Sequence, residues 1–376
     1  MLAGFCAFLD LYATQPLLPM LARLFNVTEV KIGLTVTLAT AGVALAAPFA
    51  GSISDRAGRK RTIVWSSTAL GVFTALAALS RGLDDLLLWR FLQGVFTPGI
   101  FAVTIAYIHD EWHGSESGQA TSAYVSGTVV GGFSGRFLSG FIATHIGWRW
   151  VFVTLGVLNL AGAFAMWRWL PRERTRVHKA TAAPFSVAAS HLRNPKLLAT
   201  YAVGFCVLFS MTSVFTYITF YLAAPPFHLL PSTLGSLFFV YLIGAAITPV
   251  SGRWIDRFGQ RRALALAIGG GVAGVLLTLI QNLGAVVAGL AICCTGVFIA
   301  QASASSYIGV ATRHNRALAV GLYATFYYAG GSAGAAFPGF VWRAGGWPAC
   351  VALIAAVQAL TVLLALTLWR DAEPAA

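Results

Sequence analysis

The sequence predicts an all-α membrane protein of twelve transmembrane helices in two pseudo-symmetric bundles of six. Hydrophobic residues make up 58% of the 376 residues and charged residues only 10%, which leaves too little polar surface for a soluble globule of this size. A charged segment between apolar runs, residues 51–61 (GSISDRAGRKR), recurs 201 positions later as residues 252–262 (GRWIDRFGQRR). A repeat at more than half the chain length indicates two related halves.

Twelve apolar segments come close to the ~20 residues that a helix needs to cross a bilayer. The first contains Asp10, Gln15 and two prolines and has no basic leader, so we expect a retained helix and not a signal peptide. The predicted spans are residues 2–22, 31–52, 62–80, 84–108, 118–143, 148–170, 196–222, 232–252, 262–281, 284–310, 316–342 and 347–369.

The distribution of basic residues predicts the orientation of these spans. Twelve spans place both termini on one side. Of the 25 lysines and arginines, 18 fall in the loops, tail and adjoining span ends of that side, against five in the loops and span ends of the opposite side. Short loops rich in Lys and Arg stay in the cytoplasm. We therefore expect cytoplasmic termini, and this pattern accounts for the net charge of +13 without nucleic acid.

The longest polar stretch divides the chain into an N-terminal bundle (1–170), a cytoplasmic linker (171–195) and a C-terminal bundle (196–376). Glycines at four-residue spacing, among them Gly131 and Gly135, match Gly330 and Gly334 in the second half. Such small residues allow close helix packing in lipid. The packing is either static or a smooth face on which one helix moves against another.

The repeated loop has the residues of a gate. Gly51 and Gly58 permit close contact and a tight turn, and Asp55 can accept hydrogen bonds. Arginines at 56, 59 and 61 can pair with Asp110 and Glu111 at the end of the fourth span. A solvated positive anchor is the alternative, but an anchor needs neither glycines nor an acid. The second copy offers Gly252, Asp256, Gly259 and Arg262, with Gln260 in place of Arg59.

These residues carry a resemblance to a known family. The segment GSISDRAGRKR is similar to motif A of the major facilitator superfamily, and the second copy to its weaker echo. The resemblance covers the whole chain and implies two six-helix bundles, a central site and alternating access. Residues 205–262 most resemble bacterial inner-membrane arabinose-efflux-like permeases and drug-resistance carriers, which implies an inner-membrane location.

Arg90 is the first candidate for proton coupling. With Gln93 and Gly94 it resembles the family's motif B, whose arginine is thought to assist proton transfer. A charge inside a helical span costs about 2.5 to 3.5 kcal/mol on insertion scales, so it is normally paired or hydrated. An arginine that reaches to the interface is the alternative.

Asp10 is the prime titratable site, because it is the only acidic residue that lies away from the ends of a predicted span. It lies about 12 Å along the first helix at ~1.5 Å per residue. Residues 9–19 (LDLYATQPLLP) resemble the first-helix motif of drug/proton antiporters. The alternative is an acid paired only to hold the first helix in place.

Arg136 departs from the antiporter pattern. Residues 131–140 read GGFSGRFLSG where antiporters commonly show the Gly-Pro pair of motif C. Arg136 is counted with the proton-coupling residues, because it could pair with Asp10. It could instead bind an anionic substrate, or have a partner with no role in transport.

Aromatic and amide residues are candidates for a cavity that takes amphipathic molecules, although each could instead serve packing or the membrane interface. They are Tyr12, Gln15, Asn159, Tyr217, Tyr221, Gln301, Tyr323 and Tyr327. The five cysteines fall inside predicted spans and are expected to pack there.

We expect a secondary active transporter, not an enzyme, that exports small organic or amphipathic compounds in exchange for protons. A symporter or facilitator that imports a nutrient is the competing prediction, and a nontransporting receptor or enzyme on the same scaffold is the rival from another class. The expected partners are the small-molecule substrate, protons and the lipid bilayer. We expect a monomer with no nucleic acid, no cofactor and no metal.

Overall fold

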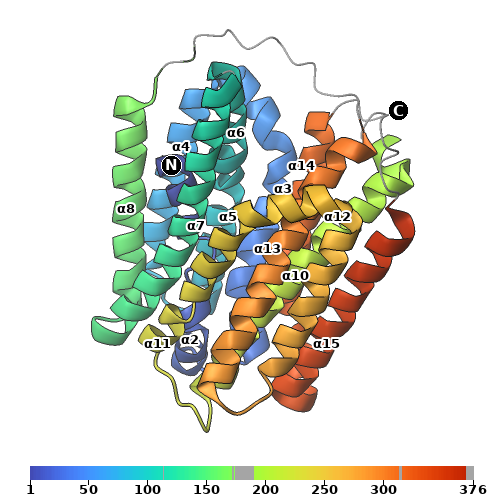
Figure 1. The fold of residues 1–376 in the computed structure, drawn as a ribbon. Coiled ribbons are helices and arrows are strands. Elements are labelled where there is room, and N and C mark those ends of the chain that lie inside the picture. The colour runs from blue at the N-terminus through green and yellow to red at the C-terminus, as the bar shows by residue number, and fades with distance from the viewer. Residues whose placement is uncertain (113, 172, 174–189, 313–315, 370–376) are drawn as a thin grey trace. The chain divides into compact units, whose positions relative to one another are not determined.

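The computed structural model describes residues 1–112, 114–171, 173, 190–312 and 316–369. All regular secondary structure in those ranges is helical (Figure 1). The all-α prediction is confirmed for this part of the chain. The helices of the first half are α1 (Leu2–Leu9), the 3-10 turn η1 (Gln15–Leu17), α2 (Leu18–Leu24), α3 (Glu29–Ala57), α4 (Arg59–Ala77), α5 (Leu83–Phe96), α6 (Pro98–Glu111), α7 (Gly114–His145) and α8 (Trp148–Trp169).

The second half continues with α10 (Pro195–Ala223), α11 (Pro231–Ser236), α12 (Phe239–Leu277), α13 (Leu283–Ala311), α14 (Arg316–Ala336) and α15 (Pro338–Leu368). Two of these helices are kinked at glycines whose backbone angles are not helical. Gly259 interrupts α12 at φ 77°, and Gly345 with Gly346 interrupts α15. Helix α12 thus covers most of the predicted spans 232–252 and 262–281, whereas α15 covers the end of span 316–342 and nearly all of span 347–369.

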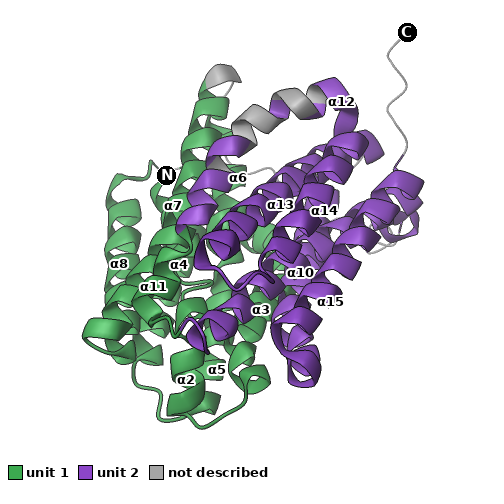
Figure 2. Ribbon diagram, turned by 60° about the horizontal axis from the view of Figure 1, so that its bottom comes forward, with its two compact units in different colours: residues 1–182, 228–238 green, residues 183–227, 239–376 purple. Residues whose placement is uncertain are grey.

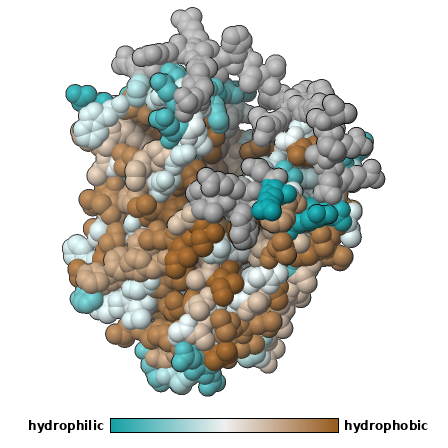
Figure 3. Space-filling model, viewed as in Figure 1, coloured by the Kyte–Doolittle hydropathy of each residue, from teal (hydrophilic) through white to brown (hydrophobic). Residues whose placement is uncertain are grey.

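Six helices of the described residues are long and apolar enough to cross a membrane: Glu29–Ala57, Leu83–Glu111, Trp148–Trp169, Pro195–Ala223, Leu283–Ala311 and Pro338–Leu368. The remaining spans stay a prediction, and the first of them is broken into short pieces. Hydrophobic side chains cover much of the face shown in Figure 3.

The chain forms two compact units (Figure 2). Unit 1 comprises Met1–Ala182 with His228–Phe238, and unit 2 comprises Ala183–Phe227 with Phe239–Ala376. The segment His228–Phe238 follows α10 in the sequence, yet its helix α11 packs on α7 of unit 1. The amide of Ser232 donates to the Thr144 hydroxyl at 2.9 Å.

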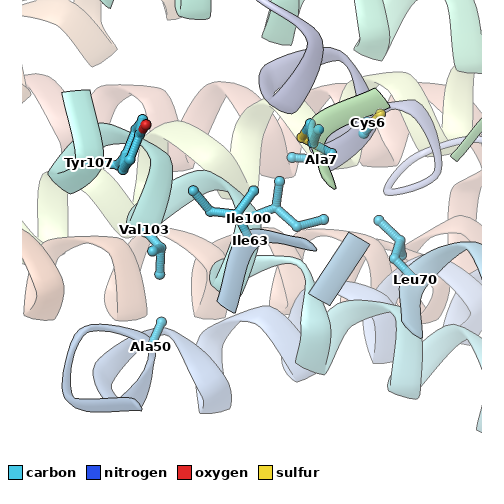
Figure 4. Packing of buried hydrophobic residues seen from close by; sticks show 9 residues of the cluster. Cys6, Ala7, Ala50, Ile63, Leu70, Ile100, Val103 and Tyr107 are labelled. Atoms are coloured by element: carbon cyan, nitrogen blue, oxygen red, sulfur yellow. The ribbon is translucent and has the colours of Figure 1, made fainter. Parts of the chain in front are cut away.

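Within unit 1, α1 packs against α7, α3 against α5, and α4 against α8. A core of aliphatic side chains joins α1, α3, α4 and α6, with Ile63, Ile100 and Val103 at most 1% exposed (Figure 4). Within unit 2, α10 packs against α14 and α15, and α12 against α13. All five cysteines are buried, as expected from their positions.

Glycines bring the helices of unit 1 into backbone contact. A Cβ built on Gly131 would lie 2.3 Å from the carbonyl oxygen of Phe5, and one on Gly135 would lie 1.8 Å from that of Leu9. No side chain fits at such distances. The predicted close approach at these glycines is therefore confirmed.

Candidate functional site

The first predicted span is not one continuous helix. Helix α1 ends at Leu9, residues 10–14 form turns, and η1 and α2 follow. Pro16 and Pro19 cause this, because each lacks the N–H that an α-helix needs and crowds the preceding turn. We call residues 10–14 the polar break. A break inside a membrane span is tolerated only where protein covers it, since lipid offers no hydrogen bonds.

Arg90 on α5 satisfies the backbone of the polar break. Its guanidinium donates to the carbonyl oxygens of Asp10 (2.9 Å) and Leu11, to that of Thr35 on α3 (3.0 Å), and to the Gln93 side chain. Arg90 is 0% exposed. The structure thus brings Arg90 to Asp10, but the contact runs to the backbone carbonyl of Asp10. An arginine that reaches to the interface is excluded.

The carboxylate of Asp10 lies in a buried polar cluster, at 1% exposure. Its Oδ2 accepts hydrogen bonds from the Thr74 hydroxyl on α4 (2.7 Å) and from the Asn159 amide on α8. Among the described residues its Oδ1 has no hydrogen-bond partner. Asn159, predicted for the substrate cavity, is thus a partner of Asp10. Thr74 was not singled out from the sequence, because nothing local distinguishes it from other span hydroxyls.

Arg136 on α7 lies in a second buried cluster, at 3% exposure. Its Nε donates to the Gln15 side-chain oxygen at 2.8 Å and its Nη1 to the Gly132 carbonyl at 2.6 Å. The guanidinium carbon lies 4.6 Å from the Tyr12 ring centre and 4.8 Å from that of Phe238. Tyr12 and Gln15, both cavity candidates, therefore meet at Arg136.

The loop between α3 and α4 is organised by Arg59. Its guanidinium pairs with Asp110 at the end of α6, lies 3.5 Å from the Asp55 carboxylate, and donates to Ser54 at 3.3 Å. We call Arg59, Asp55, Asp110 and Ser54 the Arg59 cluster. The predicted pairing of this loop with Asp110 is confirmed, and it joins α3, α4 and α6 of unit 1. Glu111 ends α6 beside Asp110.

Glu173 anchors the same loop and was missed in the sequence. It accepts the backbone N–H of Arg59 at 2.6 Å. Gly58, at φ 92°, makes the turn, and a Cβ there would lie 2.6 Å from a Glu173 oxygen. The turn predicted for Gly58 is confirmed. Glu173 stands among basic residues after the sixth predicted span, so no local pattern marks it as a partner of this loop.

Other predicted gate residues are not brought into the Arg59 cluster. Arg56 and Arg61 are exposed. Gly51 lies inside α3 with no atom within 4 Å of an added Cβ, so the close contact predicted there is wrong for this structure.

In the second copy of the loop, Gly259 has a positive φ of 77°, which matches the turn at Gly58. Gly252 has no atom near an added Cβ, and Arg262 is exposed. The side chain of Asp256 lies outside the described residues.

The remaining cavity candidates lie in unit 2. The Tyr323 hydroxyl donates to Gln301 at 2.8 Å, and the Tyr323 and Tyr327 rings stack at 5.9 Å. Tyr217 donates to the Ala335 carbonyl at 2.9 Å, and Tyr221 stacks on Trp347 at 5.9 Å. Tyr217 is completely buried and packs among aromatic rings, as the packing alternative predicts.

Comparison with known proteins decides the family. The profile described as Major Facilitator Superfamily matches residues 1–229 and 222–376, which together span the chain. The chain belongs to the major facilitator superfamily. The resemblance that the repeated loop carried is thereby confirmed at the level of the superfamily, and the protein is a membrane transporter.

Relatives and solved structures agree with this membership. The chain is 32% identical over 370 residues to an uncharacterized MFS-type transporter, YybF, of Bacillus subtilis, covering 98% of this chain and 90% of that one. It is 30% identical over 372 residues to the inner membrane transport protein YnfM of Escherichia coli, covering 98% and 89%. The nucleoside transporter NupG has the same fold, with a TM-score of 0.82, 12% identity and 98% coverage of both chains.

Proposed function

We propose that this superfamily member is a proton-coupled secondary transporter that exports small organic or amphipathic compounds by alternating access, in exchange for protons. It acts in the bacterial inner membrane with both termini in the cytoplasm. The drug/arabinose-efflux-like branch is the part of the superfamily to which we assign it, on the resemblance of residues 9–19 and 205–262.

The buried carboxyl of Asp10 is the observation that supports proton coupling. It stands at a break in a membrane span, where one oxygen accepts two hydrogen bonds and the other has no donor among the described residues. A proton can bind at that second oxygen without displacing a partner. Intramembrane acids of this kind commonly serve proton relays.

Arg90 supports a link between that proton and the conformation of the chain. Because it binds the carbonyls of Asp10 and Leu11, any shift of the polar break changes the surroundings of the carboxyl. Protonation removes a charge next to the same backbone. Protonation of Asp10 can therefore be coupled, through Arg90, to a change in the backbone geometry of the polar break. Alternating access requires such a coupling.

The Arg59 cluster supports a latch at the cytoplasmic end. It fixes the loop between α3 and α4 by charged contacts that are partly exposed and so can break and re-form at low cost. A static anchor needs no such arrangement.

The test uses purified protein in liposomes that contain a pH-sensitive dye, with ethidium, uridine and benzoate as cationic, neutral and anionic probes. For at least one probe, protons should move across the membrane in the direction opposite to that of the probe. An imposed pH gradient should also drive the flux of that probe. Asp10→Asn should reduce gradient-driven flux to background, because the variant keeps the hydrogen-bonding shape and loses the proton site. The exposed Asp84→Asn is the matched control and should transport normally.

Two results would contradict the proposal. Flux that ignores the gradient, or that survives in Asp10→Asn, removes the coupling role of Asp10. Proton and substrate moving in the same direction would replace antiport by symport, the import alternative.

A further inference from the structure

We infer that Arg136 is the binding site for a monocarboxylate substrate with an apolar or aromatic body. The inference rests on the proposed function only in taking the protein as a carrier of small organic molecules. It does not depend on Asp10 as the proton carrier or on the direction of transport.

The first argument is charge. Among the described residues of unit 1, the buried aspartate and arginine side chains are Asp10, Arg90 and Arg136, each at most 3% exposed. The membrane-embedded interior of unit 1 thus has one net positive charge when Asp10 is ionised. Burying such a charge is costly in a medium of low dielectric constant. A bound monoanion would neutralise it, whereas a cation would add to the cost.

The two arginines differ in their described partners. Arg90 is surrounded by three backbone carbonyls and the Gln93 oxygen, a set that holds the polar break together. The partners of Arg136 include one carbonyl of its own helix and the neutral amide of Gln15. An amide contact is exchangeable, because a carboxylate forms stronger, charge-assisted bonds with a guanidinium.

Gln15 is suited to such an exchange. Its side-chain oxygen accepts from Arg136 at 2.8 Å, and the same amide carries two N–H donors. When a carboxylate takes the Nε edge of Arg136, the amide can rotate and donate to it. Gly132 makes room beside the guanidinium, since a Cβ there would lie 3.3 Å from Nη1.

The body of the ligand follows from the two rings. Tyr12 and Phe238 lie against the guanidinium at 4.6 and 4.8 Å. Phe238 is 1% exposed and ends the segment His228–Phe238, which covers α7. A ligand bound to the Arg136 guanidinium would lie beside these two rings and contact apolar surface. A small inorganic anion gains nothing from such contacts, so we assign a carboxylate with an apolar or aromatic body.

The experiment measures equilibrium binding to the full chain in lipid nanodiscs without a pH gradient. The probes are acetate, hexanoate, benzoate and phenylacetate, each paired with its neutral amide, and inorganic phosphate. Hexanoate, benzoate or phenylacetate should bind at least tenfold more tightly than its amide and than phosphate or acetate. Arg136→Gln should weaken that binding by about thirty-fold or more, the effect of removing one partner of a buried charge pair.

Arg149→Gln is the matched control. Arg149 also lies against an aromatic ring, that of Trp148 at 4.4 Å, and donates to a backbone carbonyl, that of Ser80. It is outside the buried cluster, so its loss should leave carboxylate binding unchanged. Equal binding of acids and amides, or binding that Arg136→Gln leaves intact, would overturn the inference. Preference for phosphate would do the same.

Gln15→Glu tests the site in case Arg136→Gln does not fold. The new carboxylate would occupy the Nε edge of Arg136 and act as a tethered ligand. We expect a stably folded protein that no longer binds the carboxylate probes, and unchanged binding would overturn the inference. Asp10→Asn should bind them at least as well as the wild type, since the buried interior of unit 1 then has one negative charge fewer. A failure of proton coupling is thereby distinguished from a failure of the anion site.

Discussion

In unit 1, α1 packs on α7 through Gly131 and Gly135, and in unit 2, α10 packs on α14 through Gly330 and Gly334. At all four positions an added Cβ would lie within 2.3 Å of a carbonyl oxygen, that of Phe5, Leu9, Phe205 or Phe209. The partners in the two halves are 200 residues apart. Both halves therefore retain the same backbone contact.

The chemistry beside that contact differs between the halves. At the same spacing, Asp10 corresponds to Ser210, and Pro16 and Pro19 correspond to Thr216 and Thr219. Without the prolines, α10 runs unbroken from Pro195 to Ala223. The packing is thus shared by both halves. Among the described residues, the break at this position and the buried aspartate and arginine side chains belong to the first half. If the proposed function is right, its specialised residues therefore lie in unit 1.

Among the variants that test this comparison, Arg90→Met should lower the stability of the protein most. The apolar side chain would leave the carbonyls of Asp10, Leu11 and Thr35 without their donor, at about 1 to 3 kcal/mol for each buried group. We expect a strong loss of stability, measured by thermal unfolding with a thiol-reactive dye that reports exposure of the buried cysteines.

At the 202-residue spacing that aligns Gly94 with Gly296, the counterpart of Arg90 is Ile292, which is 45% exposed. Ile292→Met is therefore the control and should unfold like the wild type. If Arg90→Met were equally stable, the polar break would not depend on Arg90, and the difference between the halves would be one of sequence only.

Gly135→Ala and Gly334→Ala test the shared part of the comparison. The added methyl would lie 1.8 Å from the Leu9 oxygen or 2.3 Å from the Phe209 oxygen, so the helices must separate. Overpacking of this kind costs about 1 to 3 kcal/mol or more. Both variants should lower the unfolding temperature. Gly51→Ala, in open surroundings, should not.

A large decrease in unfolding temperature for Gly135→Ala but not for Gly334→Ala would show that the two contacts are not equivalent. A stable Gly135→Ala protein with reduced transport would instead favour a glycine face on which the helices move.

The prediction of paired halves depended on local patterns, and these were sufficient for the repeat, the glycine contacts and the pairing of the loop with Asp110. The polar break was not predicted, although Pro16 and Pro19 were visible, because hydropathy alone makes the segment look continuous. Asn159, the partner of Asp10, and Glu173, the partner of the Arg59 backbone N–H, are both distant in the sequence from the residues they bind. Only the folded structure places them there.

The two copies of the charged loop allow the finest comparison, since Arg59 is Gln260 in the second copy. Arg59→Gln converts the first loop to the second in this respect and removes the contacts to Asp55, Asp110 and Ser54. The guanidinium is 13% exposed and Asp110 39%, so the loss is about 1 kcal/mol, or about fivefold in a conformational equilibrium. Folding should be intact, because Glu173 still holds the loop through the backbone N–H of residue 59.

We therefore expect Arg59→Gln to slow turnover in liposomes about fivefold, with little change in unfolding temperature and a smaller effect at high salt, where exposed charge pairs are screened. The exposed Arg56→Gln removes the same charge from the same loop and should transport as the wild type does. Equal slowing by both variants would mean that the loop acts through its net charge. In that case the two copies of the loop would differ only in their net charge and not in the role of a specific contact. The Arg59 cluster would then be an anchor, not a latch.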